Sequence, residues 1–446
     1  MGLHLWQRPW VARVVWCPVT RTRGTIRIVT RPEWMTRNVQ VLSAVSLMQD
    51  AASEMLYPLL PVLLTSVLGA PAAVVGLVEG LAEGAAALMK YLSGRFSDRT
   101  GRKPLVGLGY GLAAVGKVVV AASAIWPFVL VGRVVDRIGK GIRGAPRDAL
   151  LADGVPTPEL GRVFGFHRTA DTLGAVIGPL VGLAVLAWTG GNIRVALWIA
   201  VIPAFLSVAL VGLVHESKRP AAVSTQAATS SEPGATHPGS TKPSSTVRPI
   251  DASPSAAAVA RHPLPRRFTR VVAVLTLIAL VNFPDALVLL RVSQIGFSVT
   301  GVIGAYVVYN LSYALVSYPG GVLADRMPRA RVYALGLLCF AIGYIGLGLV
   351  HGGWVVIALL TVYGGFNGLT DGVGKAWISS LVPPAMRGRA QGVFQGFMGG
   401  SVLIAGLWAG LIWNLGPGHG ALPLVVSGVI AAIAAPLLWA AGRRLG

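Results

Sequence analysis

The sequence predicts an all-α polytopic membrane protein whose twelve transmembrane helices form two parallel repeats of six. Its 446 residues are 54% apolar and only 12% charged, with a mean hydropathy of +0.67, whereas soluble proteins carry roughly 25% charged residues. Apolar runs of about 20 residues, long enough to cross about 30 Å of hydrocarbon, recur from Val39 to Ala441. The two halves of the chain also resemble each other. The composition excludes soluble enzymes, and the internal similarity gives the two repeats.

Twelve apolar runs are the expected membrane spans. In chain order they cover residues 39–68, 72–94, 104–124, 127–150, 164–187, 192–213, 271–292, 299–321, 332–350, 354–380, 390–413 and 421–441. Gly and Ala recur inside them, as close helix–helix contact in lipid favours. We expect an N-terminal half (39–213), a C-terminal half (271–441) and a short cytoplasmic tail (442–446).

Two segments lie outside these halves. Residues 1–38 are rich in Arg, with Glu33 as their only acidic residue, and they lack the Ser residues of a transit peptide. Two interpretations stay open: an arm that binds lipid beside the membrane, or an over-extended start with Met35 as the true initiator. Residues 214–270 are rich in Ser, Thr, Pro and Ala, so we expect a flexible linker.

The distribution of Lys and Arg predicts the orientation. Loops after odd-numbered spans carry little basic charge beyond Arg194 and Arg291, whereas loops after even-numbered spans carry Arg95, Arg99, Arg102, Lys103, Lys218, Arg219, Arg266, Arg267, Arg326, Arg329, Arg331, Arg387 and Arg389. Because basic loops stay in the cytoplasm, we expect the linker and both termini on the cytoplasmic side of a plasma (inner) membrane. Cytoplasmic loops therefore account for the net charge of +21. The basic residues are not gathered on one domain, as they would be in a protein that binds nucleic acid.

The halves superpose when the sequence is shifted by 227 residues. The coinciding positions include Gly94 with Gly321, Asp98 with Asp325, Arg99 with Arg326, Gly161 with Gly388, Arg162 with Arg389 and Gly165 with Gly392. Two six-span halves of the same orientation, joined by a cytoplasmic linker, are typical of a secondary transporter.

Two loop segments resemble a known family. Residues 94–103 (GRFSDRTGRK) are similar to the signature between spans two and three of the major facilitator superfamily, and residues 320–331 (GGVLADRMPRAR) are similar to its weaker second copy. The resemblance extends over residues 39–441 and implies the fold of that superfamily, with transport by alternating access.

Span five adds a more specific resemblance, to the drug:proton antiporter branch. The residues that match its antiporter motif are Gly174, Gly178, Pro179 and Gly182. Arg133 is placed where that branch has its span-four arginine. Asp136 and Arg137 depart from the branch, which usually has Gln or a small residue and then Gly. The glycines and proline would also serve close packing and a bend, a purely structural role that stays open.

The loop signature is interpreted as a gate. Its members are Gly94, Asp98, Arg99, Gly101, Arg102 and Lys103, with Gly321, Asp325 and Arg326 in the second copy. We expect Asp98 to cap or face a helix N-terminus, and Arg99, Arg102 and Lys103 to reach carbonyls or acids across the seam between the halves. The alternative is a topogenic role for the charges alone.

Ionisable residues inside spans are functional candidates, because each is costly in lipid. Counted from the outer face at 1.5 Å per residue, Glu54, Glu79, Lys117 and Arg133 lie at roughly 8–10 Å, and Asp50, Glu83, Asp136 and Arg137 at roughly 13–16 Å. We expect these two layers to be either structural ion pairs or a proton relay, with Asp171 extending the path. His167, near the cytoplasmic end of span five, is expected to be a loop-edge residue.

The C-terminal half offers a less charged cavity. Its aromatic and amide candidates for substrate contact are Tyr306, Tyr309, Asn310, Tyr313, Phe366 and Trp377. Its ionisable positions inside spans are Asp285, Asp371 and Lys375. We therefore expect ion coupling mainly in the first half and contact with an organic substrate mainly in the second.

The leading hypothesis is proton-coupled export of small organic compounds by a monomer in the lipid bilayer. Alternatives of the same fold are an organic-anion transporter and a divalent-metal exporter with Asp50, Glu54, Glu79 and Glu83 as oxygen ligands. A membrane receptor or a membrane-embedded enzyme is the alternative of another class. We expect no cofactor and no resident metal, because Cys17 and Cys339 lack ligand spacing and no catalytic HExxH or GxSxG pattern occurs.

Overall fold

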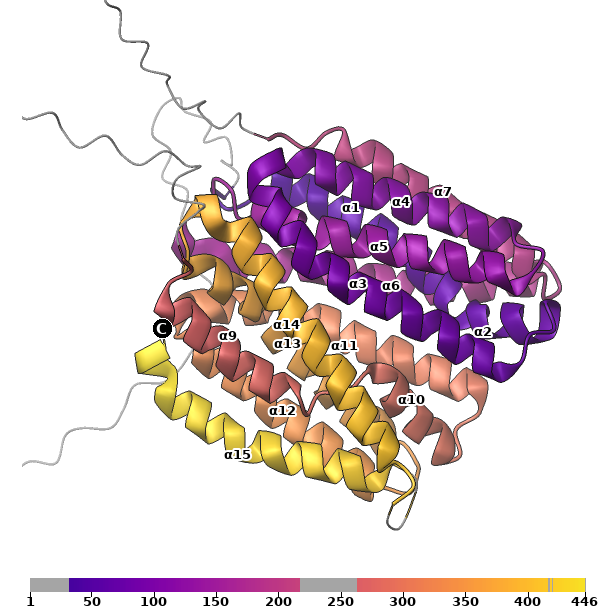
Figure 1. Ribbon diagram of the computed structural model, residues 1–446. Helices are drawn as coiled ribbons and strands as arrows, with labels where there is room; N and C mark the ends of the chain where they lie inside the picture. The colour runs from indigo at the N-terminus through magenta and orange to yellow at the C-terminus, as the bar shows by residue number, and fades with distance from the viewer. Residues whose placement is uncertain (1–31, 217–262, 416–417, 419, 446) are drawn as a thin grey trace, which may run out of the picture. The chain divides into compact units, whose positions relative to one another are not determined.

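The computed structural model describes residues 32–216, 263–415, 418 and 420–445, and it gives the backbone alone for residues 66, 72, 73, 75, 76, 94–100, 299, 300 and 443–445. The arginine-rich extension up to residue 31 and linker residues 217–262 lie outside the described residues. The described residues contain helices and no β-strand. Figure 1 shows the helices of the first half on one side and those of the second half on the other.

The first half contains six membrane-crossing elements. They are α1 (Arg37–Leu56) with its continuation through η1 (Tyr57–Leu59), α2 (Leu60–Val62) and η2 (Leu63–Val67), then α3 (Ala72–Thr100), α4 (Arg102–Ala122), α5 (Trp126–Leu151), α6 (Leu160–Trp188, after the turn η3, Thr157–Glu159) and α7 (Ile193–Val211). The sequence predicted a transmembrane helix over residues 39–68, but this first span is not one regular helix. Pro58 and Pro61 cannot donate a backbone hydrogen bond, and the chain passes through 3₁₀ and π geometry there.

The second half repeats this plan. Its elements are α9 (Arg266–Ala279) with α10 (Asp285–Gln294), α11 (Val299–Arg326), α12 (Arg329–Leu349), α13 (Val355–Ser380), α14 (Arg387–Leu411, after the turn η4, Pro384–Met386) and α15 (Ala421–Leu445). The seventh predicted span, residues 271–292, is divided between two helices, because the chain leaves helical geometry between α9 and α10. Pro284 causes this break, since it disfavours helical geometry at Phe283.

Seven of the described helices are long and apolar enough to cross a membrane on length and composition alone. Span seven fails this test because it is in two pieces, and α5 fails because charged residues recur along it. The remaining crossings follow from the repeated architecture, so the twelve-span, two-repeat fold is confirmed. Each half has its own apolar core, built mainly from α9–α15 in one half and from α1–α7 in the other.

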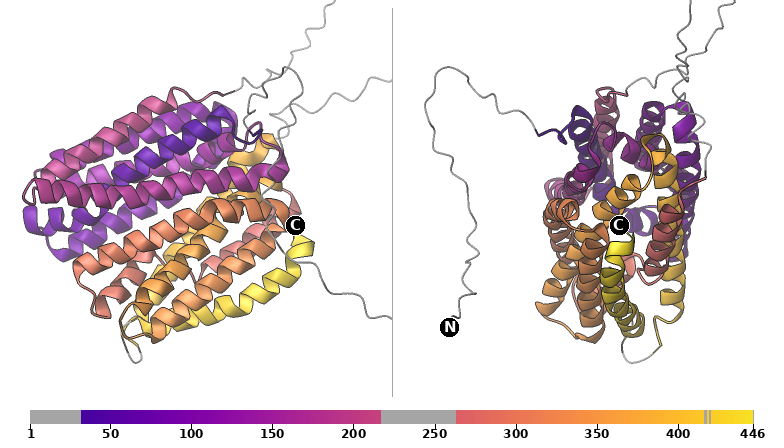
Figure 2. Two further views of the ribbon diagram at one scale, coloured as in Figure 1. Left: turned by 180° about the vertical axis from the view of Figure 1, so that it is seen from behind. Right: turned by 90° about the vertical axis from the view of Figure 1, so that its left-hand side faces the viewer.

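The two copies of the loop signature lie at the same end of the bundle, which we call the motif end. There α3 meets α4 at Gly101, whose φ of +89° favours glycine, and α11 meets α12. Near this end α6 crosses α11 backbone to backbone: a Cβ added to Gly321 would overlap the carbonyl oxygen of Gly161, and one on Gly165 would lie 2.6 Å from the Ser317 oxygen. Figure 2 shows from behind how α6 and α11 run side by side. The halves therefore meet closely at the motif end.

Candidate functional site

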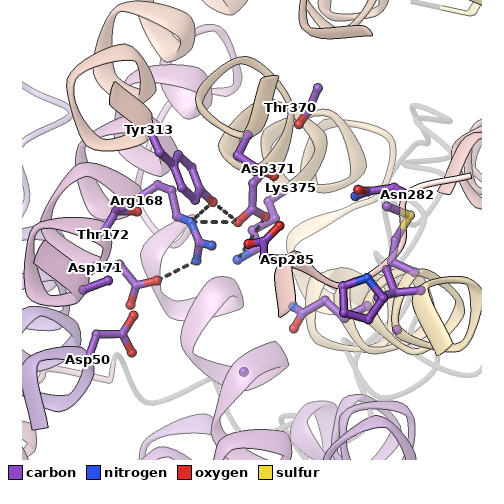
Figure 3. Close-up of a pocket in the computed structure, with 18 of the residues that line it drawn as sticks. Asp50, Arg168, Asp171, Thr172, Asn282, Asp285, Tyr313, Thr370, Asp371 and Lys375 are labelled. Atoms are coloured by element: carbon purple, nitrogen blue, oxygen red, sulfur yellow. Dashed lines mark hydrogen bonds and ion pairs between the residues drawn. The ribbon is translucent and has the colours of Figure 1, made fainter. Parts of the chain in front are cut away.

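A cavity of about 560 Å³ lies between the two halves. Its walls come from α1, α3, α5 and α6 on one side and from α10, α11, α13 and α14 on the other, and Figure 3 shows the polar residues that face it. The candidates that line it are Asp50, Glu54, Glu83, Asp171, Asp285, Tyr306, Tyr309, Asn310, Tyr313, Phe366 and Asp371. Lys375 lines it as well, whereas Glu79, Lys117, Arg133, Asp136, Arg137 and Trp377 are not among the lining residues.

Three acids of the first half each contact a basic residue. Arg133 is almost completely buried and donates to both carboxylate oxygens of Glu79, at 2.8 and 3.1 Å. Lys117 Nζ lies 2.8 Å from Asp136 Oδ1, and a separate pair joins Arg137 to Glu83. Because the charges of α5 are met from α3 and α4, they are shielded from lipid.

Asp50 and Glu54, which the depth estimate also placed near Arg133 and Arg137, do not join these pairs. Glu54 instead accepts a hydrogen bond at 3.1 Å from the hydroxyl of Tyr306, in the other half. Asp50 forms no hydrogen bond or ion pair with any described residue, and Figure 3 shows it on the cavity wall beside Asp171. The four acids proposed as metal ligands are thus dispersed, and among the described residues no group of three or more His, Cys, Asp or Glu is placed to hold a metal ion.

Three acidic and three basic residues form a closed ring on the motif-end wall of the cavity. Successive N–O distances around it are Arg147–Asp148 3.0 Å, Arg147–Asp171 3.9 Å, Arg168–Asp171 2.6 Å, Arg168–Asp371 2.8 Å, Lys375–Asp371 3.7 Å and Lys375–Asp148 3.4 Å. We call this set the charge ring. It takes two residues each from α5, α6 and α13, so it joins the two halves and carries no net formal charge.

Asp285 is held without a basic residue. As the first residue of α10 it follows the break at Pro284, and its carboxylate accepts hydrogen bonds from Tyr363 at 2.7 Å and Tyr309 at 2.8 Å. No described lysine or arginine forms an ion pair with it. Tyr309 also accepts from Asn367 at 2.6 Å. The acid is therefore positioned by neutral donors and by the positive end of a helix dipole, and it faces the cavity.

Two sequence-based expectations were wrong. His167 is not a loop-edge residue: it is buried inside α6, with its ring nitrogens 3.4 Å from Ser43 Oγ and 3.5 Å from Ser46 Oγ. Trp377 does not line the cavity but is buried in the apolar core of the second half. His167 was misplaced because α6 begins at Leu160, before the predicted start of the span at residue 164. Trp377 was misplaced because hydropathy does not give the rotation of a side chain about its helix.

The motif end is closed by contacts of the second signature copy and of Arg102. Asp325 accepts hydrogen bonds from the backbone N–H groups of Gly161 and Arg162, at 2.7 and 2.9 Å, and so caps the start of α6 from the other half. Arg102 pairs with Asp153 at 2.6 Å and donates to the Pro384 carbonyl across the seam.

Other signature residues behave differently. Lys103 stays within its own half, donating to the Gly212 carbonyl at 3.0 Å, and Arg326 is exposed. The side chains of Asp98 and Arg99, and the surroundings of Gly94, lie outside the described residues. Further closure comes from Arg329, which donates to the Thr157 carbonyl. The cavity is therefore shut toward the motif end.

The span-five motif packs against α1 within the first half. A Cβ on Gly174 would lie 2.5 Å from the Leu47 oxygen and one on Gly178 would lie 2.5 Å from the Ala51 oxygen, while at Gly182 the nearest atom would be 3.4 Å away. Pro179 lies inside α6. These residues bring α6 and α1 together, so they position Asp171 and Asp50 rather than face a ligand.

Sequence reasoning did not single out several residues that the structure places at the cavity. Asp148, which joins the charge ring but is not among the residues that line the cavity, was overlooked because it lies near the end of its helix. Lys90 is seven residues after Glu83, and this helical spacing is a signal that would have put both on one face. Lys140 and Arg143 lie in the same span as Arg133, Asp136 and Arg137 but were not singled out as site residues.

A two-repeat helical bundle around a polar cavity defines a membrane transporter. Comparison with known sequences agrees: residues 42–284 and 271–444 both match the model of the Major Facilitator Superfamily, and the chain belongs to this superfamily. It is 29% identical over 407 residues to an uncharacterized MFS-type transporter of Methanocaldococcus jannaschii, covering 89% of this chain and 94% of that one.

Solved structures share the fold. The human organic anion transporter MFSD10 superposes with a TM-score of 0.69 at 17% identity, over 92% of this chain and 100% of that one. The proton:xylose symporter XylE superposes with a TM-score of 0.69 at 16% identity, over 91% and 95% of the two chains. At these identities the likeness concerns the fold alone.

Proposed function

We propose that this transporter exports a small organic compound in exchange for protons, by alternating access through the cavity between its halves. The motif end is cytoplasmic in this proposal, as the arginine distribution predicts, and the protein acts as a monomer in the plasma membrane. The closed motif end then makes the structure an outward-facing state. Alternating access requires the charge ring and the Asp325 cap to open when the cavity turns toward the cytoplasm.

The observation that carries the proposal is the contrast between Asp285 and the paired acids. Exchange requires a group that a proton and the substrate cannot occupy together. Acids such as Glu79 are already occupied by an arginine. Asp285 faces the cavity with hydroxyl partners only, and so can take up either a proton or a positively polarised group of the substrate. Asp50, without a described partner, is the second candidate for a proton site.

Proton movement in proteoliposomes tests this function. Purified protein is reconstituted with pyranine inside the vesicles, and drugs, organic anions, zwitterions and divalent cations are first ranked by the thermal shift they produce. Addition of a stabilising compound outside is expected to change the internal pH in the wild-type protein. Asp285→Asn is expected to abolish this change while leaving some pH-independent substrate exchange, because an amide does not take up a proton.

Glu33→Gln is the matched control, since Glu33 is exposed and remote from the cavity; it should behave as the wild type. Substrate movement that is never accompanied by a change in internal pH would show an uncoupled transporter and end the proposal. Proton movement in the same direction as the substrate would show symport and contradict exchange.

A further inference from the structure

Three basic side chains form one face of the cavity, which we call the basic face: Lys90 of α3 with Lys140 and Arg143 of α5. Neither lysine forms an ion pair with any described residue. Arg143 is only 4% exposed, and its Nε and Nη1 have no hydrogen-bond partner among the described residues. Its guanidinium lies over the Tyr110 ring at 4.4 Å.

Neighbouring acids do not balance the basic face. Glu83 is taken by Arg137 at 3.0 Å, and Asp171 belongs to the neutral charge ring. Asp50 and Glu54 are the remaining acids of the first-half wall, and Glu54 is hydrogen-bonded to the Tyr306 hydroxyl, so two acids stand against three cations. A buried charge without a partner costs several kcal/mol, and a basic cluster retained inside a membrane protein marks a site for a compensating charge. An anionic group of a ligand supplies that charge.

Across the cavity the chemistry is reversed. Asp285 accepts only from tyrosines, and the rings of Tyr306, Tyr309 and Tyr313 line the wall beside it, with neighbouring centroids 6.0 and 6.4 Å apart. A carboxylate beside aromatic faces is a favourable environment for an ammonium group, which gains both ion pairing and cation–π attraction.

We propose that the substrate is a zwitterion, whose anionic group binds the basic face while its ammonium group binds Asp285 and the surrounding tyrosines. This inference rests on the proposed exchange function, in which the proton displaces the ammonium group from Asp285. It narrows the substrate class to compounds that carry both charges, separated by a spacer that crosses the cavity.

Binding of ω-amino acids to the purified protein tests the inference without a gradient. Calorimetry in detergent compares 4-aminobutyrate, 6-aminohexanoate and 8-aminooctanoate with hexanoate and hexylamine, which carry one charge each. One spacer length is expected to bind at least about tenfold more tightly than either singly charged compound, since each added ion contact is worth about a factor of ten or more in affinity.

Variants should split the two contacts. Lys140→Gln, with Lys90→Gln as the second variant, is expected to weaken the zwitterion and hexanoate and to leave hexylamine unchanged. Asp285→Asn is expected to weaken the zwitterion and hexylamine and to leave hexanoate unchanged. Arg270→Gln, at an exposed position of α9, and Glu33→Gln are the matched controls, and unfolding temperatures check that each variant folds.

Equal affinity for the zwitterions and the singly charged compounds, no binding of any of them, or equal losses in both variants would overturn the inference. Each of these results leaves proton exchange to be judged by the pyranine measurement, which is independent of the ligand's charge. Conversely, tight zwitterion binding without proton movement would uphold the site and reject the exchange function.

Discussion

Arg168 of α6 and Asp371 of α13 form an ion pair across the seam between the two halves, with Nε 2.8 Å from Oδ2. Tyr313 of α11 hydrogen-bonds to both of them, and Figure 3 shows the three groups meeting at one point on the cavity wall. On its other side Arg168 reaches Asp171 of its own helix at 2.6 Å. One guanidinium therefore links an acid from each half, at the place where an opening motion must separate them.

Arg168→Gln is expected to open the motif end. The substitution leaves Asp171 and Asp371 without their shared cation. Because Arg168 and Asp371 are both partly exposed, the cost is smaller than the about 3–5 kcal/mol of breaking a fully buried pair. Spin labels at Thr157→Cys and Arg326→Cys, both exposed at the motif end, should move apart in double electron–electron resonance, in a background with Cys17 and Cys339 replaced by Ser. The added substitution Asp371→Asn should restore part of the closed population, and Arg270→Gln should change nothing. An unaltered label distance in Arg168→Gln would show that the ring does not hold the motif end shut.

Asp325→Ala is expected to slow transport without weakening substrate binding. The residue caps α6 from the opposite half, and loss of a helix cap costs about 1 kcal/mol, which lowers the closed-to-open ratio by about fivefold. Asp325→Asn keeps one acceptor oxygen and should show a smaller effect. Transport rate and calorimetric affinity measured on the same preparations check this. A lost affinity with unchanged turnover would assign Asp325 to ligand binding instead.

Asp98→Asn is expected to slow transport in the same way. By the sequence repeat Asp98 corresponds to Asp325, so it should act on closure rather than on the ligand. The measurement is the initial rate of transport at saturating substrate, with expression and unfolding temperature as folding controls. Full wild-type turnover would mean that only the second copy of the signature is a gate.

Arg133→Ala is expected to lower the unfolding temperature more than Glu79→Gln. Arg133 serves two acids, since its Nη1 also lies 3.5 Å from Asp136, so its removal strands Glu79 completely and Asp136 partly, at a cost of about 3–5 kcal/mol. Glu79→Gln keeps a hydrogen-bond acceptor for the guanidinium. Thermal unfolding in detergent measures both. Equal shifts would indicate that Glu79 is the only acid that depends on Arg133.

Much of the fold could be predicted because a membrane imposes simple rules on the sequence. Span lengths and the offset of 227 residues led to two six-span halves, and counting depth along straight helices brought Glu79 level with Arg133 and Glu83 level with Arg137, as the structure places them. Helix breaks were missed, although Pro284 was a visible signal, because a long apolar run hides an interruption of a few residues.

The cavity could be predicted only in part, since depth does not fix which way a helix is turned or which helix of the other half it meets. The charge ring depends on such information: Asp148, Lys375 and Arg168 come from three helices, and their contacts cross between halves. The expected division of labour, with ions in the first half and substrate in the second, does not describe this ring, which both halves build together.

The close approach of Gly161 and Gly321 also affects how fast the two halves can move relative to each other in the proposed alternating access. Where side chains of two helices interdigitate, they must repack when the helices move past each other, and this repacking adds to the activation barrier. At these glycines backbone packs directly against backbone. The rocking motion of the proposed alternating access would therefore need little repacking of side chains there. The methyl group added by Gly321→Ala would overlap the Gly161 carbonyl and keep the motif end open. This substitution offers a way to trap the state that is open at the motif end for structure determination.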